Sequence, residues 1–397
     1  MKKLKQLYCK HEYKFFSDTK VFPILSLSQV NGYRYVCCKC NKEITEYLDA
    51  DYIYIPYDKD YELKIKNHEL VNLNSVILTN KDKKVYSPVS GNIMGLCETI
   101  INGNLSKAIV IENNFKETSK LRGSKKDIST YSKEELLSLI KEYNACFKPI
   151  TKDNLIINGI DYEPYEETLS YLISAHTDEI LECIDALCKI LEIDKCFFAI
   201  KNNDQENVVT LVNQIGTYPN IDLKLLPDLY PAGHPKVLLN EFHLEEENTA
   251  VLTVEDIYAI YTVLKRKRPI SEKLITVSGN LLTKSKVMKV KIGTNIKDIL
   301  EKEFKLKSND YHIIINGLLS GYEINSLNAI ITPEIRSVFI NTIDKSRATK
   351  CINCGLCNTY CPVGADRKSG YKMNECLHCN LCTYICPAKR NPGDQNE

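Results

Sequence analysis

The sequence contains no tryptophan, only 4 methionines and almost no net charge. Its 52 lysines and arginines nearly cancel its 51 aspartates and glutamates, which excludes a global electrostatic attraction to nucleic acid or to an anionic membrane surface. No apolar run approaches the roughly 20 residues of a membrane span, and the basic N-terminal stretch lacks the apolar core of a signal peptide. We therefore expect a cytoplasmic protein that binds no nucleic acid and is at most peripheral on the cytoplasmic side of the membrane.

Cysteine, by contrast, is abundant. The chain has 17 cysteines, and in a protein that is not exported these are expected to be metal ligands and reduced core thiols rather than a disulfide scaffold. Two near copies of one motif stand out, CINCGLCNTYCP from Cys351 and CLHCNLCTYICP from Cys376. Each copy has the CxxCxxCxxxCP spacing of bacterial ferredoxins, in which three cysteines hold one [4Fe–4S] cluster and the fourth crosses to the other.

This spacing predicts two [4Fe–4S] clusters and suggests an anaerobic or reducing setting. We call residues 351–361 the first cysteine run and residues 376–386 the second cysteine run. The predicted ligands of the first cluster are Cys351, Cys354, Cys357 and Cys386. Those of the second cluster are Cys376, Cys379, Cys382 and Cys361. Disulfides and a zinc knuckle are the alternatives, but zinc needs only four ligands and would leave half of these thiolates without a purpose.

The first 50 residues carry a second candidate metal site. Cys9, His11, Cys37 and Cys40 form a CxH…CxxC set, which matches the ligand types of a structural zinc site. The gap between the two pairs is long, so free thiols in a small accessory segment remain the alternative to a zinc-ribbon-like segment at 1–50.

Between these ends the hydrophobic pattern changes along the chain. Residues 51–118 alternate apolar and polar positions in short stretches, which predicts a small β domain. Residues 119–250 alternate strand-like and helical stretches, which predicts a parallel sheet with helices on its faces. Ligands of such sheets bind beyond the carboxyl ends of the strands, where the polar stretch NGIDYEPYEE begins at Asn158. The predicted strands are 154–159, 196–200 and 221–227.

Local signals in this region predict two helices. Ser132 and Glu135 have the spacing of a capping box, and Thr177 is expected to cap a helix with Cys183 and Cys188 on its apolar face. Core packing is the expected role of these cysteines and of Cys196.

Residues 251–345 begin with the helical pattern TVEDIYAIYTVLKRKR. Two strands, a short helix capped near Asn295 and a further strand follow, which predicts a β-grasp-like module and an interaction platform rather than a catalyst. With the ferredoxin domain at 346–397, the expected fold class is a multidomain combination of α+β and α/β parts.

Several motifs, taken in order, resemble the C subunit of the Rnf electron-transport complex. They are VYSPVSGNIMGL with AIVIEN, LIINGIDYEPY, LLPDLYPAGHPKVLL, KLITVSGNLL with VKIGT, and the doubled cysteine run. The resemblance covers roughly residues 55 to 390 and extends to the cobalamin reductase of propanediol utilisation. It implies a barrel-sandwich domain, a Rossmann-like domain similar to the flavin-binding subunit of respiratory complex I, a soluble-ligand-binding β-grasp (SLBB) domain and a ferredoxin domain. In that family FMN takes hydride from NADH and passes single electrons to the clusters.

The chain departs from the family in the implied flavin site. The resemblance assigns Asn158, Asp161 and Glu163 to that site, but the family's ECEP is DYEP here, and Pro235 replaces the glutamate after the YPxG motif. No glycine occurs between Gly123 and Gly159, where the family has a glycine-rich loop over the flavin phosphate. Without glycines the backbone cannot approach a phosphate closely, so FMN is doubtful and the three residues are expected to be vestigial.

These observations favour an electron-transfer component that relays electrons through two [4Fe–4S] clusters and does not oxidise NADH itself. Its expected partners are a ferredoxin, a flavoprotein or other subunits of an electron-transport complex. The first alternative is an FMN-containing, NAD(P)H-dependent oxidoreductase with rearranged flavin contacts. The second is a docking or assembly module whose clusters are structural.

Overall fold

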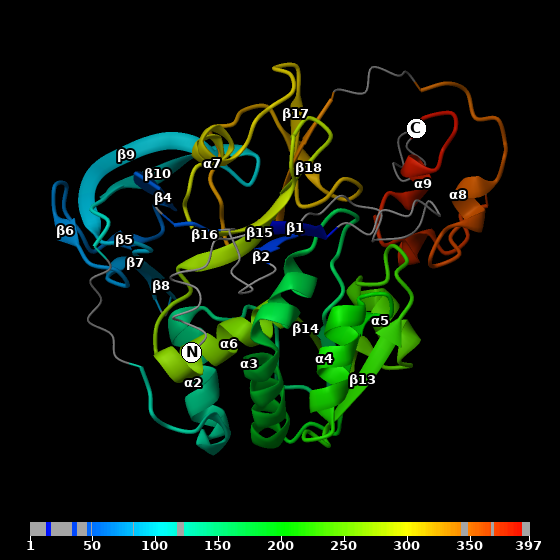
Figure 1. Cartoon of the computed structure of the whole chain (residues 1–397), viewed down its shortest axis with the longest axis horizontal. Helices are drawn as coiled ribbons and strands as arrows, with labels where there is room; N and C mark the ends of the chain where they lie inside the picture. Colours follow the sequence, from blue (N-terminus) through cyan, green and yellow to red (C-terminus); the bar gives the residue numbers. More distant parts are fainter. Residues whose placement is uncertain are drawn as a thin grey trace.

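The computed structural model describes the backbone of strands β1 (Tyr13–Phe16) and β2 (Arg34–Cys37) and of residue 46, and, in full, residues 47–48, 50–81, 83–116, 123–342, 348–366 and 369–390. Figure 1 shows a β-rich half, an α/β half and a C-terminal segment that lies beside both. β1 and β2 form an antiparallel pair in which Tyr13 is opposite Cys37.

The α/β half is built on a parallel sheet of four strands in the order β13-β12-β11-β14. β11 (Asn154–Asn158) lies between β12 (Lys195–Lys201) and β14 (Thr249–Thr253), and β13 (Ile221–Leu226) is the edge strand beside β12. Residues 155–157 of β11 are apolar and buried, as expected for a central strand that is covered on both faces. The predicted parallel sheet is therefore confirmed.

Helices cover both faces of this sheet. Leu155 and Ile157 point to one face and Ile156 to the other, because side chains alternate along a strand. The helices that share a core with Leu155 and Ile157 are α2 (Lys133–Tyr143), α3 (Thr168–Leu191), α4 (Gln205–Ile215) and α6 (Val254–Arg266). α5 (Pro235–Glu241) packs with Ile156 on the opposite face.

Two boundaries of the α/β half differ from the prediction. α3 begins at Thr168, before the predicted start, and the Thr177 hydroxyl donates to the Ile173 carbonyl (2.6 Å) instead of capping a helix. Non-helical backbone angles at His176 mark a kink just before Thr177. The helix expected to open the β-grasp-like module is α6, which packs with α3 after the fourth parallel strand, so the α/β half continues beyond residue 250 through Arg266.

Besides the β1–β2 pair, the described residues of the β-rich half form three sheets. The first is antiparallel, with β4 (Tyr52–Pro56), β10 (Asn104–Asn113), β9 (Gly91–Ile101) and β6 (Leu70–Val71) in that order. The second contains β5 (Glu62–Leu63), β7 (Val76–Asn80) and β8 (Lys83–Tyr86). Both lie within the region predicted to be a small β domain.

The third sheet has six strands and occupies most of the predicted β-grasp-like region. Its order is β18 (Tyr322–Ile324), β17 (His312–Ile315), β19 (Ser337–Asn341), β15 (Glu272–Ser278), β16 (Lys286–Lys291) and β3 (Glu46–Tyr47). α7 (Ile296–Glu303) packs against it and is capped by Asn295 as predicted. One hydrophobic core joins this sheet to the first two, so the predicted modules 51–118 and 251–345 are fused.

The C-terminal segment carries two short helices, α8 (Leu356–Thr359) and α9 (Leu381–Tyr384). It lies near α5 and the β17–β18 hairpin in Figure 1. The remaining short turns are 3-10 helices, η1 (Ile128–Thr130), η2 (Glu246–Asn248) and η3 (Met373–Glu375). Among the helices of the described residues, none combines the length and apolarity that a bilayer crossing requires.

Candidate functional site

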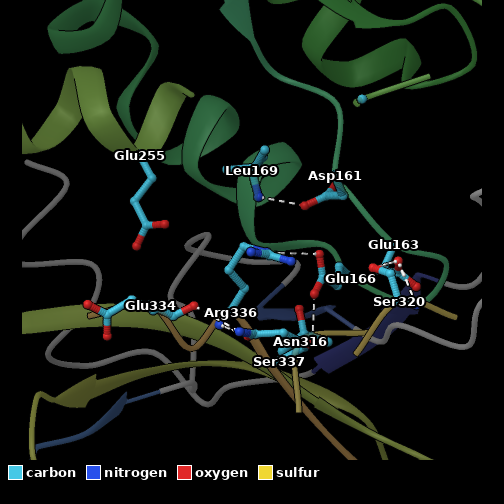
Figure 2. A network of polar contacts seen from close by, with 12 residues as sticks. Asp161, Glu163, Glu166, Leu169, Glu255, Asn316, Ser320, Glu334, Arg336 and Ser337 are labelled. Carbon is cyan, nitrogen blue, oxygen red and sulfur yellow. Dashed lines mark hydrogen bonds and ion pairs between the residues drawn. The ribbon is translucent and has the colours of Figure 1, made fainter. Parts of the chain in front are cut away.

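Polar residues gather at the carboxyl edge of the parallel sheet. Asn158 ends β11, and Asp161 and Glu163 follow in the loop to α3, all three buried. Figure 2 shows Asp161, Glu163 and Glu166 along this loop, opposite Ser320, Arg336 and Ser337 of the β-rich half. The three predicted residues are thus in one place, at the edge where ligands of parallel sheets bind.

The side-chain amide of Asn158 forms hydrogen bonds with backbone groups on both its nitrogen and its oxygen. Its amide nitrogen donates to the Gly233 carbonyl (2.9 Å), and its side-chain oxygen accepts from the Ile160 N–H (2.9 Å). These bonds tie the end of β11 to the segment before α5, which gives Asn158 a structural role.

Asp161 belongs to a buried charge cluster. Its Oδ1 accepts from the Leu169 N–H (2.8 Å), and its Oδ2 lies 3.8 Å from Lys201 Nζ at the end of β12. Burial raises the pKa of Asp161 to about 6, although Lys201 opposes the shift. Burial would lower the pKa of Lys201, but nearby carboxylates raise it above its usual value, chiefly those of Asp161, Asp228, Glu167 and Asp204.

Glu163 connects the α/β half to other parts of the chain. Its carboxyl oxygens accept from the Leu319 N–H (2.9 Å), the Ser320 N–H (3.2 Å) and the Ser320 hydroxyl (2.5 Å). Tyr230 places its hydroxyl 3.0 Å from Glu163 Oε1. Burial raises the pKa of Glu163 to about 7, against the lowering effect of the bonds from Ser320 and Leu319.

A second buried acid lies nearby. Glu166 Oε1 accepts from the Ser337 hydroxyl (2.5 Å), and its Oε2 lies 3.6 Å from Arg336 Nε. The Arg336 guanidinium stands over the Tyr162 ring, 4.7 Å from the centroid. Tyr162 is the residue that replaces the cysteine of the family's ECEP motif, and its ring is packed between the two halves of the molecule.

The described residues show no phosphate cradle of backbone N–H groups at the position that the resemblance implies. The stretch before β11 has no glycine, and the start of α6 is already capped by Thr253 Oγ1, which accepts from the Asp256 N–H (3.1 Å). Lys148 Nζ donates to Asp256 Oδ2 (2.6 Å) rather than facing an open site. Asn158 and Glu163 are also engaged by protein groups, so a flavin contact at either residue, as the resemblance implies, would have to replace those bonds.

A cavity of about 370 Å³ lies beside this stretch, next to Cys146. Its volume is in the range of small-ligand sites. The charged side chains on its wall are balanced, three of each sign: Lys83, Lys84, Lys273, Glu255, Asp256 and Glu334.

Cys379 of the second cysteine run lies near the thiols of Cys376, Cys382 and Cys361. Burial, with smaller contributions from the thiols of Cys382, Cys361 and Cys376, raises the pKa of Cys379 to about 11. Cys361 comes from the first run, so its proximity is the grouping that a crossed ligand set requires. No three His, Cys, Asp or Glu side chains of the described residues are placed to hold a single metal ion; a cubane differs, because each thiolate binds its own iron.

The two runs have different surroundings. Cys351 and Cys354 of the first run are exposed, and Ile352 between them is 64% exposed. The second run faces the α/β half, where Leu381 is 2% exposed and shares a core with Ile156. None of the cysteines with described side chains forms a disulfide, and Cys183, Cys188 and Cys196 are buried in the core as predicted.

The predicted zinc ligands cannot be placed. Cys9, His11 and Cys40 lie outside the described residues, and Cys37 is described only as the last backbone position of β2.

Sequence reasoning missed several residues of this site. Lys201 carried a signal, because a lysine at the end of a buried apolar strand needs a partner. Tyr230, Ser320 and Arg336 carried none, since they contact Glu163 or Glu166 across long separations in sequence.

Comparison with known proteins gives matches to two family models and to several relatives. Residues 142–258 match the family model of the Nuo51 FMN-binding domain, and residues 347–367 match the 4Fe-4S binding domain. The C subunit of an ion-translocating oxidoreductase complex from Buchnera aphidicola is 25% identical over 345 residues, 79% of this chain and 73% of its own length. The C subunit of a proton-translocating ferredoxin:NAD(+) oxidoreductase complex from Clostridium ljungdahlii is 25% identical over 70% of this chain and 67% of its own length.

The chain is therefore similar to RnfC proteins over most of its length. The relatives are covered unevenly, since the chain spans only 54% of the corresponding ion-translocating oxidoreductase protein from Haemophilus influenzae. A solved structure of an NAD+-reducing [NiFe]-hydrogenase aligns with 54% of this chain and 50% of the hydrogenase chain, at 12% sequence identity and a TM-score of 0.42. The match to an FMN-binding domain favours a flavin in this RnfC-like chain and counts against the expectation that it holds none.

Proposed function

We propose that this chain transfers electrons through two [4Fe–4S] clusters as the C subunit of an ion-translocating ferredoxin:NAD+ oxidoreductase complex. The observation that carries the proposal is the doubled cysteine run itself, whose eight cysteines form no disulfide. Each cluster takes up and releases one electron, and the eight cysteines supply the four thiolates that each cluster needs.

The surroundings of the two runs support an order for the two sites. The site of the second run is the inner one, because Tyr230 and Leu381 hold that run against the carboxyl edge of the parallel sheet. The site of the first run is the outer one, because Cys351 and Cys354 are exposed. A redox partner, which is a ferredoxin, a flavoprotein or another protein of the complex, then meets the chain at the first run.

A flavin-containing oxidoreductase is the second candidate. The matched FMN-binding domain and the cavity beside Cys146 favour it. The missing glycine-rich turn and the engaged carboxylate of Glu163 do not support the family's mode of binding, so a flavin in this chain would occupy the cavity through other contacts.

One preparation tests both candidates. Chain purified anaerobically is expected to contain about eight iron and eight sulfide, and its visible absorbance should bleach when a reduced low-potential ferredoxin is added. Iron without rapid bleaching would favour the docking-module alternative. Acid extraction then decides the flavin: stoichiometric FMN, with NADH bleaching the clusters in the absence of a partner, would establish the second candidate.

A further inference from the structure

Three parts of the chain meet at the hydroxyl group of Tyr230. This residue precedes α5 in the α/β half, and its side chain is buried. Its hydroxyl lies 2.6 Å from the backbone carbonyl oxygen of Cys379 in the second cysteine run, to which it donates, and 3.0 Å from Glu163 Oε1. The β-rich half joins this contact through Glu163, which accepts the bonds from Leu319 and Ser320.

The loop that carries Leu319 and Ser320 also binds the second run directly. Asn380 donates from its side-chain amide to the Leu319 carbonyl oxygen (2.8 Å). Glycine at position 317 is required for the approach, because its φ is +114° and a Cβ there would lie 2.0 Å from Glu163 Cγ. These contacts therefore form a ring that runs from Glu163 through Leu319, Asn380, the neighbouring Cys379 and Tyr230, whose hydroxyl donates its one proton to Cys379 and lies 3.0 Å from Glu163.

Apolar packing accompanies this ring on one side. Leu381, two residues after Cys379, is 2% exposed and packs in a core with Ile156, Ile160, Tyr230 and Leu238. These residues belong to the face of the sheet opposite α3. The second run is thus fixed by directional bonds at Cys379 and Asn380 and by burial at Leu381, whereas the cysteines at the start of the first run are exposed.

We propose that Glu163, Tyr230 and the loop 317–321 form a seat that fixes the second cysteine run against the sheet edge, with Glu163 and Tyr230 as positioning residues. In this proposal the Glu163 carboxylate stabilises a junction between domains and does not contact a flavin. The hydroxyl of Tyr230 orients the peptide of a cysteine ligand, and groups that orient ligands and change the polarity around a cluster alter its reduction potential. The effect on potential rests on the proposed function, while the seat itself does not.

The test removes single polar atoms and keeps the shape of each side chain. Tyr230→Phe deletes the hydroxyl that reaches Cys379, and Glu163→Gln keeps the size of the acid. Tyr384→Phe is the matched control, because Tyr384 lies on α9 in the same run and is 58% exposed. All variants are examined as the full chain, purified anaerobically, with iron content measured first.

Hydrogen exchange of peptides covering residues 376–386 is the first measurement. Tyr230→Phe and Glu163→Gln should each exchange about tenfold faster than the wild type there, because a buried acceptor or donor loses its partner. Peptides of α3 should be unchanged, which shows that the chain still folds. Tyr384→Phe should exchange like the wild type. Equal exchange of the second run in Tyr230→Phe, Glu163→Gln and Tyr384→Phe would overturn the seat.

The second measurement is a redox titration followed by electron paramagnetic resonance. In Tyr230→Phe the midpoint potential of one cluster should shift and that of the other should stay, with no shift in Tyr384→Phe. Faster hydrogen exchange of the second cysteine run without a shift in midpoint potential would support the seat and contradict its effect on the cluster. If the preparations contain no clusters, the proposed function fails, yet the exchange experiment still decides the seat.

Discussion

Replacing Lys201 with methionine should loosen the α/β half more than the length of its ion pair suggests. Lys201 Nζ lies 3.8 Å from Asp161 Oδ2 and both side chains are buried, whereas Lys189 Nζ lies 2.6 Å from Asp185 Oδ2 with the lysine 55% exposed. Removing one member of a buried pair costs about 3–5 kcal/mol, because the other charge stays buried without compensation. Exposed pairs contribute about 0.2–1 kcal/mol.

We expect the lower end of that range, about 3 kcal/mol. Burial already raises the pKa of Asp161 to about 6, so its carboxyl group can take up a proton when the lysine is lost. In hydrogen exchange followed by mass spectrometry, this corresponds to roughly 100-fold faster exchange of the β11 and β12 amides at pH 7. Lys189→Met is the matched control and should change the exchange of α3 by about twofold.

The double variant Lys201→Met/Asp161→Asn should recover part of the loss, because it removes the uncompensated carboxylate along with the lysine. Recovery will be incomplete, since Asp228 and Asp204 also face Lys201. Equal effects of Lys201→Met and Lys189→Met would refute the argument that burial, and not distance, sets the strength of these pairs.

Three further predictions concern other parts of the chain. The pKa of Asp161 is raised to about 6 in the fold, so the native state holds the proton of this carboxyl group more tightly than the unfolded state does. In urea unfolding, the stability of the wild type relative to Asp161→Asn should therefore fall by up to about 3 kcal/mol as pH rises from about 4 to 6. Cys361→Ser should halve the iron content and remove the signal of the cluster held by the second run; loss of the other signal instead would contradict the crossed assignment. If Cys9, His11, Cys37 and Cys40 bind zinc, elemental analysis should find one zinc that deletion of residues 1–44, which spares β3, removes.

Local sequence patterns predicted much of the secondary structure. The capping box of Ser132 and Glu135 is present at the start of α2, and the three strands predicted for the parallel sheet are β11, β12 and β13. The start of α3 was missed for a physical reason. Threonine hydroxyls serve as helix caps and also donate to a carbonyl four residues back, and the sequence around Thr177 does not distinguish the two.

The fourth parallel strand was missed for a different reason. Residues 250–252 are apolar, but β14 pairs with β11, which is far away in the sequence, and only that pairing shows that the segment belongs to the sheet. Similarly, β3 joins the six-stranded sheet through β16, so residues 46–47 cannot be assigned to the N-terminal segment alone. Contacts over such distances leave no periodicity in a single sequence.

In the candidate site, too, local spacing could be predicted from the sequence and long-range contacts could not. The doubled cysteine run predicts two ligand sets from sequence alone, because ligands of clusters obey a local spacing, and these sets stay predictions. The position of Glu163 at the sheet edge followed from the strand before it, but its partners Tyr230, Leu319 and Ser320 could not be predicted. A motif therefore specifies where a carboxylate lies and leaves open which groups it contacts.

Glu163 shows what this means for a flavin. A flavin that used Glu163 as the family resemblance implies would break its bonds from Leu319 and Ser320, and each unpaired N–H would cost about 1–3 kcal/mol. A flavin in the cavity beside Cys146 avoids that cost. If the chain purifies with flavin, Glu163→Gln should therefore keep its flavin content while loosening the second cysteine run. If Glu163→Gln instead lost its flavin while the hydrogen exchange of that run stayed unchanged, Glu163 would be a flavin contact, as the resemblance implies.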